Sequence, residues 1–394
     1  MNYLLRCTFT IGLLAYTALA SPGDDLYAFQ DCLYQCEQIT CNNNPYHIIQ
    51  QEFYTELSNN PDYEFRYYNP HWQFDPMPLP LHLRLLGWNC ESNCDYQCQR
   101  IITGERIKNH EEIYQFHGKW PFLRVLGIQE LTSVVMSLGN LYVNYQSFKK
   151  IWSSVITNDS VPSNLKYQFT NIFVVQIVTM CAWLFSTIFH VRDYILTERL
   201  DYYFAGLTVL TQFHALGARY FNLYKHSRVV YRWLFSLACI LAYVYHVHRL
   251  YTDWSYTYNM QANICVGLSQ NVFYCLVCFG LYVKYYNLEQ TENKVILNHL
   301  NYVDSQRIIL SSFFTRSSKL FSLYPLLLCF IVVCGMALEV FDFPPVFFDL
   351  VDAHSLWHLV TIVPVYMGWY DWLVWDVYEN VWSNIQEEDK KKKE

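Results

Sequence analysis

Long apolar runs recur along most of this chain and constrain its fold more than any other feature. Hydrophobic residues make up 53% of the 394 residues, and several runs reach the roughly 20 residues that a helix needs to cross a bilayer. In a bilayer core each backbone polar group must be satisfied within the protein, which favours helices. We therefore predict an all-α membrane protein with seven spanning helices, at residues 122–145, 171–190, 201–220, 229–249, 262–285, 320–340 and 353–377.

A region of different character precedes the first predicted helix. Residues 1–20 are typical of a secretory signal peptide, because an apolar stretch ends in Ala18-Leu19-Ala20. An uncleaved anchor is the alternative. Residues 21–121 are polar and rich in tyrosine. Six of the 14 cysteines lie there in two clusters, at Cys32, Cys36, Cys41, Cys90, Cys94 and Cys98.

These two cysteine clusters predict disulfide bonds. An even number of clustered cysteines behind a signal peptide is typical of a domain that folds in an oxidising lumen. Three bridges allow about 15 pairings, and the sequence does not choose among them. A structural zinc site is the alternative, and neither cluster contains the histidine that such sites often use. We therefore expect residues 21–121 to form a small, disulfide-rich lumenal domain.

The distribution of basic residues predicts the orientation of the helices. With residues 21–121 in the lumen, the cytosolic loops and tail carry 15 lysines and arginines, against three in the lumenal loops after the first helix. Basic residues stay on the cytosolic side of a membrane, so this orientation is favoured. It makes residues 122–379 a seven-helix domain and residues 380–394 a cytosolic tail. The basic residues form no exposed stripe, which argues against nucleic-acid binding.

Two short motifs follow from this orientation. The sequon Asn158-Asp159-Ser160 lies in a predicted cytosolic loop and should carry no glycan. The tail ends in a lysine run in which Lys391 and Lys392 resemble the dilysine retrieval signal of endoplasmic-reticulum membrane proteins. The alternative is that the run only enforces topology.

Five polar residues are brought to the lumenal leaflet by this topology. Ser186 and His190 lie at the lumenal end of the second predicted helix, and Asp201 begins the third. His354 and His358 share one face at the start of the seventh. Three imidazoles match a catalytic zinc site that keeps one position open. Asp201 would then transfer a proton and Ser186 would support an oxyanion. The alternative is that each histidine is a core hydrogen-bonding residue.

Other polar residues in the apolar segments favour structural roles. His214 lies deep in the third predicted helix and is expected in the core. His246 and His248 are two residues apart and point in different directions on a helix. Glu130 in the first predicted helix is expected to pair with polar groups inside the bundle, because an unpaired carboxylate is costly in lipid.

The pattern Ser186-x3-His190-x10-Asp201, followed by His354-x3-His358, resembles the seven-helix hydrolase superfamily that includes alkaline ceramidases and adiponectin receptors. This resemblance implies the zinc chemistry alone. In the ceramidases the glutamate at the place of Glu130 belongs to a calcium site, whose other acidic ligands are not evident here.

Longer stretches resemble one family more specifically. Phe189-His190-Val191-Arg192-Asp193 and Asp352-Ala353-His354-Ser355-Leu356-Trp357-His358, with the cysteine-rich segment, resemble the Per family of GPI-anchor lipid-remodelling proteins, known in animals as post-GPI-attachment phospholipase A2. The resemblance implies removal of the sn-2 acyl chain from the phosphatidylinositol of GPI-anchored proteins, in the endoplasmic-reticulum membrane. It also implies a zinc ion held by the three histidines, with Ser186 and Asp201 as the catalytic pair.

Three other functions are weighed against this one. A lumenal chaperone or receptor for GPI-anchored proteins would use the cysteine-rich domain and no hydrolytic site. A ceramidase-like amide hydrolase would use the same zinc chemistry on a different lipid. A metal transporter is disfavoured, because the polar residues gather at one face and do not cross the bilayer. The sequence does not specify the oligomeric state.

Overall fold

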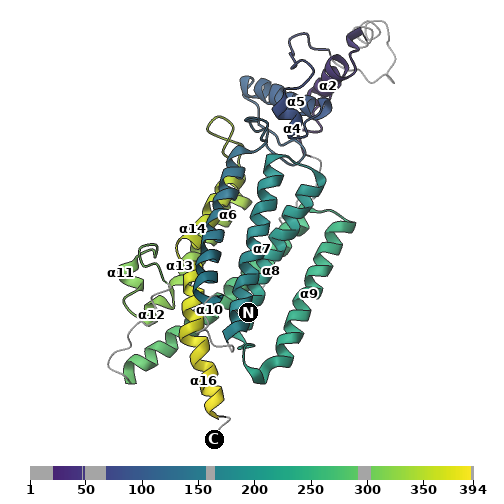
Figure 1. The fold of residues 1–394 in the computed structure, drawn as a ribbon. Helices are drawn as coiled ribbons and strands as arrows, with labels where there is room; N and C mark the ends of the chain where they lie inside the picture. Colours follow the sequence, from purple (N-terminus) through teal and green to yellow (C-terminus); the bar gives the residue numbers. More distant parts are fainter. Residues whose placement is uncertain (1–20, 47, 49–67, 157–164, 292–302, 392–394) are drawn as a thin grey trace, which may run out of the picture. The chain divides into compact units, whose positions relative to one another are not determined.

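The computed structural model describes residues 21–46, 48, 68–156, 165–291 and 303–391 (Figure 1). The predicted signal peptide, the Asn158 sequon and Lys392 of the predicted retrieval signal lie outside these residues. The described part is helical and contains no β-strand, which confirms the all-α class for these residues. Contacts between Cα atoms divide the chain into two units. The first is Met1–Thr132 with His190–Asp193 and Asp342–Ala353, and the second is the rest.

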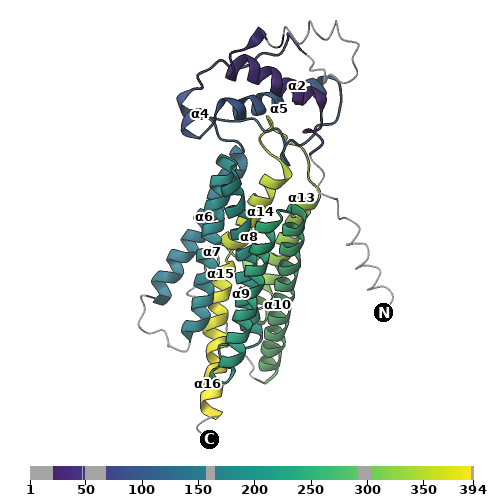
Figure 2. The same cartoon turned by 90° about the vertical axis from the view of Figure 1, so that its right-hand side faces the viewer.

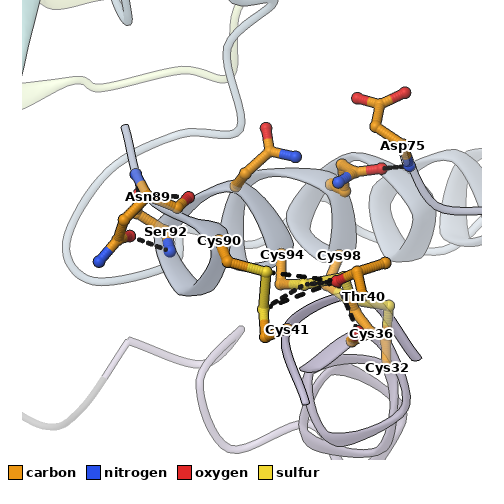
Figure 3. The surroundings of a disulfide bond; sticks show 12 residues. Cys32, Cys36, Thr40, Cys41, Asp75, Asn89, Cys90, Ser92, Cys94 and Cys98 are labelled. Carbon is orange, nitrogen blue, oxygen red and sulfur yellow. Dashed lines mark hydrogen bonds between the residues drawn. A yellow bond between two sulfur atoms is a disulfide. The ribbon is translucent and has the colours of Figure 1, made fainter. Parts of the chain in front are cut away.

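The first unit is built on two helical segments that disulfide bonds join. Its helices are α2 (Tyr27–Cys36), the π-helical turn η1 (Glu37–Cys41), α4 (Leu81–Leu85) and α5 (Cys90–Lys108). Three bridges connect α2 and η1 to α5 (Figure 3), namely Cys32–Cys98, Cys36–Cys94 and Cys41–Cys90. Because the first cysteine pairs with the last, the two segments run antiparallel. The predicted disulfides are confirmed, with one of the possible pairings chosen.

The cysteine spacing explains the π-helical turn. The cysteines of α5 recur every four residues and face one side of that helix. Cys41, however, follows Cys36 by five residues. A π-helical turn has i→i+5 hydrogen bonds, so η1 returns Cys41 to the face that carries Cys36. Four of the bridged cysteines form a buried cluster with aromatic and aliphatic residues of this unit, namely Cys32, Cys36, Cys94 and Cys98 with Phe29, Trp72, Ile102 and Phe116.

The second unit is a bundle of long helices, several of which lie side by side (Figures 1 and 2). α8 packs against both α9 and α10, and α13 packs against α10 and α15. The elements are α6 (Leu131–Ile151), η2 (Trp152–Ile156), α7 (Lys166–Val191), α8 (Ile195–Tyr220), η4 (His226–Arg228), α9 (Val229–Thr252), α10 (Tyr256–Thr291), α11 (Ser311–Phe314), α12 (Ser318–Phe321), α13 (Tyr324–Val340), α14 (Ala353–Tyr366), α15 (Trp369–Asp376), η6 (Val377–Val381) and α16 (Trp382–Lys391).

Four helices in the described residues are long and apolar enough to cross a membrane. They are Lys166–Val191, His226–Thr252, Tyr256–Thr291 and Ser318–Val340. They coincide with four of the seven predicted spans. Helices also occupy the other three predicted positions, but they do not meet the same length and hydropathy criteria. The count of seven spans therefore stays a prediction.

The first predicted helix begins later than expected. Residues 122–130 are not helical, and α6 starts at Leu131. Instead, Val125 and Ile128 pair across a tight turn in which Leu126 and Gly127 have φ angles of 52° and 87°. Glycine adopts this left-handed region readily, and it is the residue that most favours such a turn. The prediction of a helix from residue 122 is therefore wrong at its start.

The last predicted helix is interrupted. α14 ends at Tyr366, and α15 begins at Trp369 after Gly368, whose φ angle is 90°. Pro364 inside α14 lacks the N–H that would continue the hydrogen-bond ladder. A single helix over residues 353–377 is thus wrong, since these two residues divide it.

Small residues let two helices approach α14 closely. A Cβ atom added to Gly335 of α13 would collide with Val360, and one added to Gly139 of α6 would lie 2.8 Å from Cδ1 of Ile362. Helices in apolar surroundings pack closely where such small residues face a neighbour. α6 and α13 are consequently near enough to α14 for their polar side chains to reach it.

Candidate metal centre

Helices α7 and α14 carry the three histidines that the sequence singled out. His190 and His358 are buried, and His354 is partly exposed. Each offers one ring nitrogen, and these three nitrogen atoms lie within 4.8 Å of one another. The rings of His354 and His358 have centroids 4.5 Å apart, as expected for residues four apart on a helix. The three histidines could therefore hold one metal ion.

His190 is oriented by a carboxylate. Its Nδ1 atom lies 2.7 Å from Oε2 of Glu130, a buried residue just before α6. An ionised carboxylate can only accept, so Nδ1–H of the imidazole donates. The backbone N–H of Glu130 also donates to the carbonyl of His190 at 3.1 Å. These two bonds hold the end of α7 against residue 130.

Lys119 pairs with the second carboxylate oxygen of Glu130. Its ammonium donates to Oε1 of Glu130 at 2.7 Å and lies 3.1 Å from the Asp193 carboxylate. Burial lowers the pKa of Lys119, but the charges of Glu130 and Asp193 outweigh burial and the net effect raises it. Glu130 is thus paired with a permanent cation on one oxygen and a histidine on the other.

The other two histidines have separate partners. Nδ1 of His354 lies 2.8 Å from Oε1 of Glu339 at the end of α13. Nδ1 of His358 lies 2.9 Å from the Ser137 hydroxyl of α6. Asn140, one turn further along α6, donates from Nδ2 to the backbone carbonyl of His358 at 2.7 Å. α6 therefore positions both the ring and the backbone of His358.

The three imidazole rings use the same nitrogen atom for their protein contacts. Each uses Nδ1 for a protein partner, so Nε2 is the nitrogen that a metal would bind in each case. Partners of this kind fix the tautomer and the direction of a metal-binding imidazole. Three imidazole nitrogen donors with such partners form a chemically suitable metal site.

The two predicted catalytic residues are placed differently by the structure. The Ser186 hydroxyl is buried and lies 3.2 Å from the Ser137 hydroxyl, which in turn contacts His358. Asp201 lies in the second turn of α8 with a partly buried side chain, and it is not one of the grouped metal-ligating residues. Their catalytic roles stay predictions.

The remaining histidines in apolar segments lie outside the group of three. A ring nitrogen of His214 is 2.9 Å from the Ser236 hydroxyl, and its ring stacks on Phe235. His246 lies 3.4 Å from the Tyr258 hydroxyl. His214 is only partly buried, so its predicted place in the core is not fully met, and its structural role stays a prediction.

Sequence reasoning missed the partners of the histidines. Lys119, Glu339 and Ser137 are not among the predicted site residues, and Glu130 is predicted only to pair with polar groups inside the bundle. A signal existed in α6, where Ser133, Ser137 and Asn140 form a buried polar stripe at helical spacing. Glu339 was also conspicuous, as the acidic residue that ends an otherwise apolar helix.

We expect Glu130→Gln to weaken metal binding by about 10-fold to 100-fold, the usual effect of losing such a partner. The amide still offers an oxygen to His190, but it loses the charge that pairs with Lys119. Metal titration of the detergent-purified protein measures the effect. Glu289→Gln, which alters the ion pair with Lys319 elsewhere in the bundle, is the control. Equal metal affinity in both variants would show that Glu130 does not act on the site.

The chain is similar to several curated proteins over nearly its whole length. It is 39% identical to Protein PER1 of Saccharomyces cerevisiae over 391 residues, 97% of this chain and 99% of that protein. It is 29% identical to the Protein PER1 homolog of Schizosaccharomyces pombe, over 92% of this chain and 89% of that protein. It is 28% identical to the human protein named GPI-specific phospholipase A2-like PGAP3, over 91% and 90% respectively.

No solved structure matches the chain. The model of the Per1-like family matches residues 80–377, which include all three histidines, helix α5 and most of the second unit. The chain therefore belongs to the Per1-like family.

Proposed function

We propose that this protein is a zinc-dependent acyl-ester hydrolase that removes the sn-2 fatty acid from the phosphatidylinositol of GPI-anchored proteins. The observation that carries the proposal is the group of three histidines with separate Nδ1 partners. The choice of substrate is supported by relatives whose printed name is GPI-specific phospholipase A2-like PGAP3.

The donor set suits zinc. Catalytic zinc sites commonly use three protein ligands and keep a fourth position for water or substrate. When bound, zinc supplies Lewis acidity and an activated water at neutral pH. His190, His354 and His358 would hold the ion. Their ring partners fix the direction in which each imidazole points.

The reaction adds water across one ester bond. The bond between the acyl carbon and the oxygen on the second glycerol carbon breaks, giving a free fatty acid and a lyso lipid. In this proposal Asp201 takes a proton from the attacking water and returns it to the leaving alkoxide. The Ser186 hydroxyl donates a hydrogen bond to the oxyanion. Its contact with Ser137, beside His358, supports this role.

The protein would act in the endoplasmic-reticulum membrane, with its disulfide-bonded unit in the lumen and its tail in the cytosol. Four candidate spans and the basic residues of the predicted cytosolic loops support this arrangement. The bridges of the first unit support an oxidising compartment. The partners are then GPI-anchored proteins and the surrounding lipids.

The proposal is tested by lipid analysis of GPI-anchored proteins from cells that express only this chain. The double variant His354→Ala, His358→Ala, matched for abundance, should retain diacyl lipid and lose the lyso form. His226→Ala, an exposed position in η4, is the control and should behave like the unsubstituted chain. An unchanged lipid profile in the double variant would refute the hydrolase and favour a chaperone of GPI-anchored proteins.

A further inference from the structure

A cavity of about 410 Å³ lies within the first unit, close to the disulfide bonds. Such a volume is within the range of small-molecule sites. Four carboxylates line it, against two permanently charged cations, so its lining has an excess of negative charge. We call it the acidic cavity and define it by Glu37, Glu91, Asp95, Trp120 and Lys119.

Disulfide bonds hold three of the carboxylates together. Glu37 directly follows Cys36, and Glu91 and Asp95 directly follow Cys90 and Cys94. Because bridges join η1 to α5 at these cysteines, the backbone positions that carry the three carboxylates are held close together. Burial raises the pKa of Glu37, and the nearby charges of Glu91 and Asp95 raise it further.

Within the part of the chain that the structure describes, two of these carboxylates form no ion pair. Asp95 is bonded to His117 at 2.9 Å and to Gln99 at 2.9 Å. Among the described residues neither Glu37 nor Glu91 forms an ion pair. A cation in the cavity would lower the repulsion between these carboxylates. The cavity therefore favours a positively charged group.

Aromatic and amide side chains on the other walls of the acidic cavity suit a sugar ring. Phe122 and Trp120 line the cavity, and the Trp120 indole is held by a hydrogen bond of 2.9 Å to Asp342. Aromatic faces of this kind provide apolar contact for the carbon face of a sugar, while amphipathic rings also tolerate nearby polar groups. Gln99 and Gln129 add amide groups that can bond to hydroxyls.

Hydrogen bonds within the first unit also link the acidic cavity to one candidate metal ligand. Lys119 lines the cavity and donates to Glu130, and Glu130 is bonded to the metal-ligating candidate His190. Two hydrogen bonds thus separate the cavity wall from a ligand imidazole.

We propose that the acidic cavity binds a sugar bearing a protonated amine in the head group of the lipid substrate. Glu37 and Glu91 pair with the ammonium, and Trp120 contacts the ring. The inference deepens the proposed function, on which it rests for the choice of a glycosylated phosphatidylinositol. It assigns recognition of the substrate to the disulfide-bonded unit and leaves the hydrolysis to the histidines.

The test measures binding without turnover. Full-length protein carrying His354→Ala and His358→Ala is purified in detergent micelles, and three lipids are compared: glucosaminyl-phosphatidylinositol, its N-acetylated form and phosphatidylinositol. We expect the amine form to bind about tenfold more tightly than the acetylated form, as for one charge-assisted contact. Adding Glu37→Gln and Glu91→Gln should abolish this preference. Adding Glu112→Gln, exposed and outside the cavity lining, should preserve it.

Further readouts separate recognition from structure. The Glu37→Gln, Glu91→Gln variant should unfold at no lower temperature than its parent, because it relieves repulsion. Equal binding of the amine and acetylated lipids by the parent would overturn the proposal. Calcium binding that the same substitutions remove, without any amine preference, would overturn it in favour of a metal site. Amine preference without hydrolysis by the unsubstituted chain would count against the proposed function alone.

Discussion

Replacing His358 with alanine is expected to remove the bound metal and to lower lipid hydrolysis about a thousandfold or more, since metal catalysis supplies several kcal/mol. His358 is buried, and α6 bonds to both its ring and its backbone carbonyl. Its loss leaves two imidazoles, which are too few for the site described above. The fold should survive, because α14 keeps its remaining contacts with α6 and α13.

Metal content per protein, measured by elemental analysis after purification in detergent, provides the direct readout. A chelator should inactivate the unsubstituted protein, and added zinc should restore it, whereas the variant should stay inactive. His226→Ala should keep both metal and activity. If His358→Ala retained the metal, the three histidines would not be its ligands.

Replacing Asp376 with alanine is expected to destabilise the bundle by about 3–5 kcal/mol, the usual penalty for breaking a buried ion pair. Asp376 in α15 accepts two hydrogen bonds from Arg219 at the end of α8, at 2.6 Å and 2.9 Å. Both side chains are largely shielded from solvent. The substitution would leave the guanidinium charged, buried and unpaired.

The free energy of unfolding in detergent measures this effect. The double substitution Arg219→Met, Asp376→Leu removes both charges and should recover much of the stability. Glu289→Ala breaks the more exposed pair with Lys319 and should cost at most about 1 kcal/mol. An Asp376→Ala variant as stable as the parent would mean that water already solvates Arg219.

Local patterns in the sequence predicted the parts of the site that lie on single helices. The four-residue spacing of His354 and His358 placed both rings on one face of α14. The membrane topology then brought His190 to the same group. Long apolar runs likewise located the helices of the second unit, because burial in lipid requires them.

Contacts between distant segments could not be predicted in this way. Lys119 reaches Glu130 through the turn at Leu126 and Gly127, where the hydropathy pattern suggested a continuous helix. Glu339 of α13 and His354 of α14 are separated by a non-helical segment. The length of that segment in the sequence does not show that the two side chains meet. The break at Gly368 is similar, since the segment stays apolar on both sides and only the backbone angle reveals it.

The nested disulfides give the first unit an unusual covalent topology. Each bridge joins a cysteine at or before Cys41 to one at or after Cys90. A single peptide cleavage anywhere between these two residues would therefore leave both fragments attached by three bonds. The amino-terminal piece, which carries Glu37, could be shed only after reduction. Resistance to proteolytic release is thus a property of the pairing pattern itself, independent of the sequence of the intervening segment.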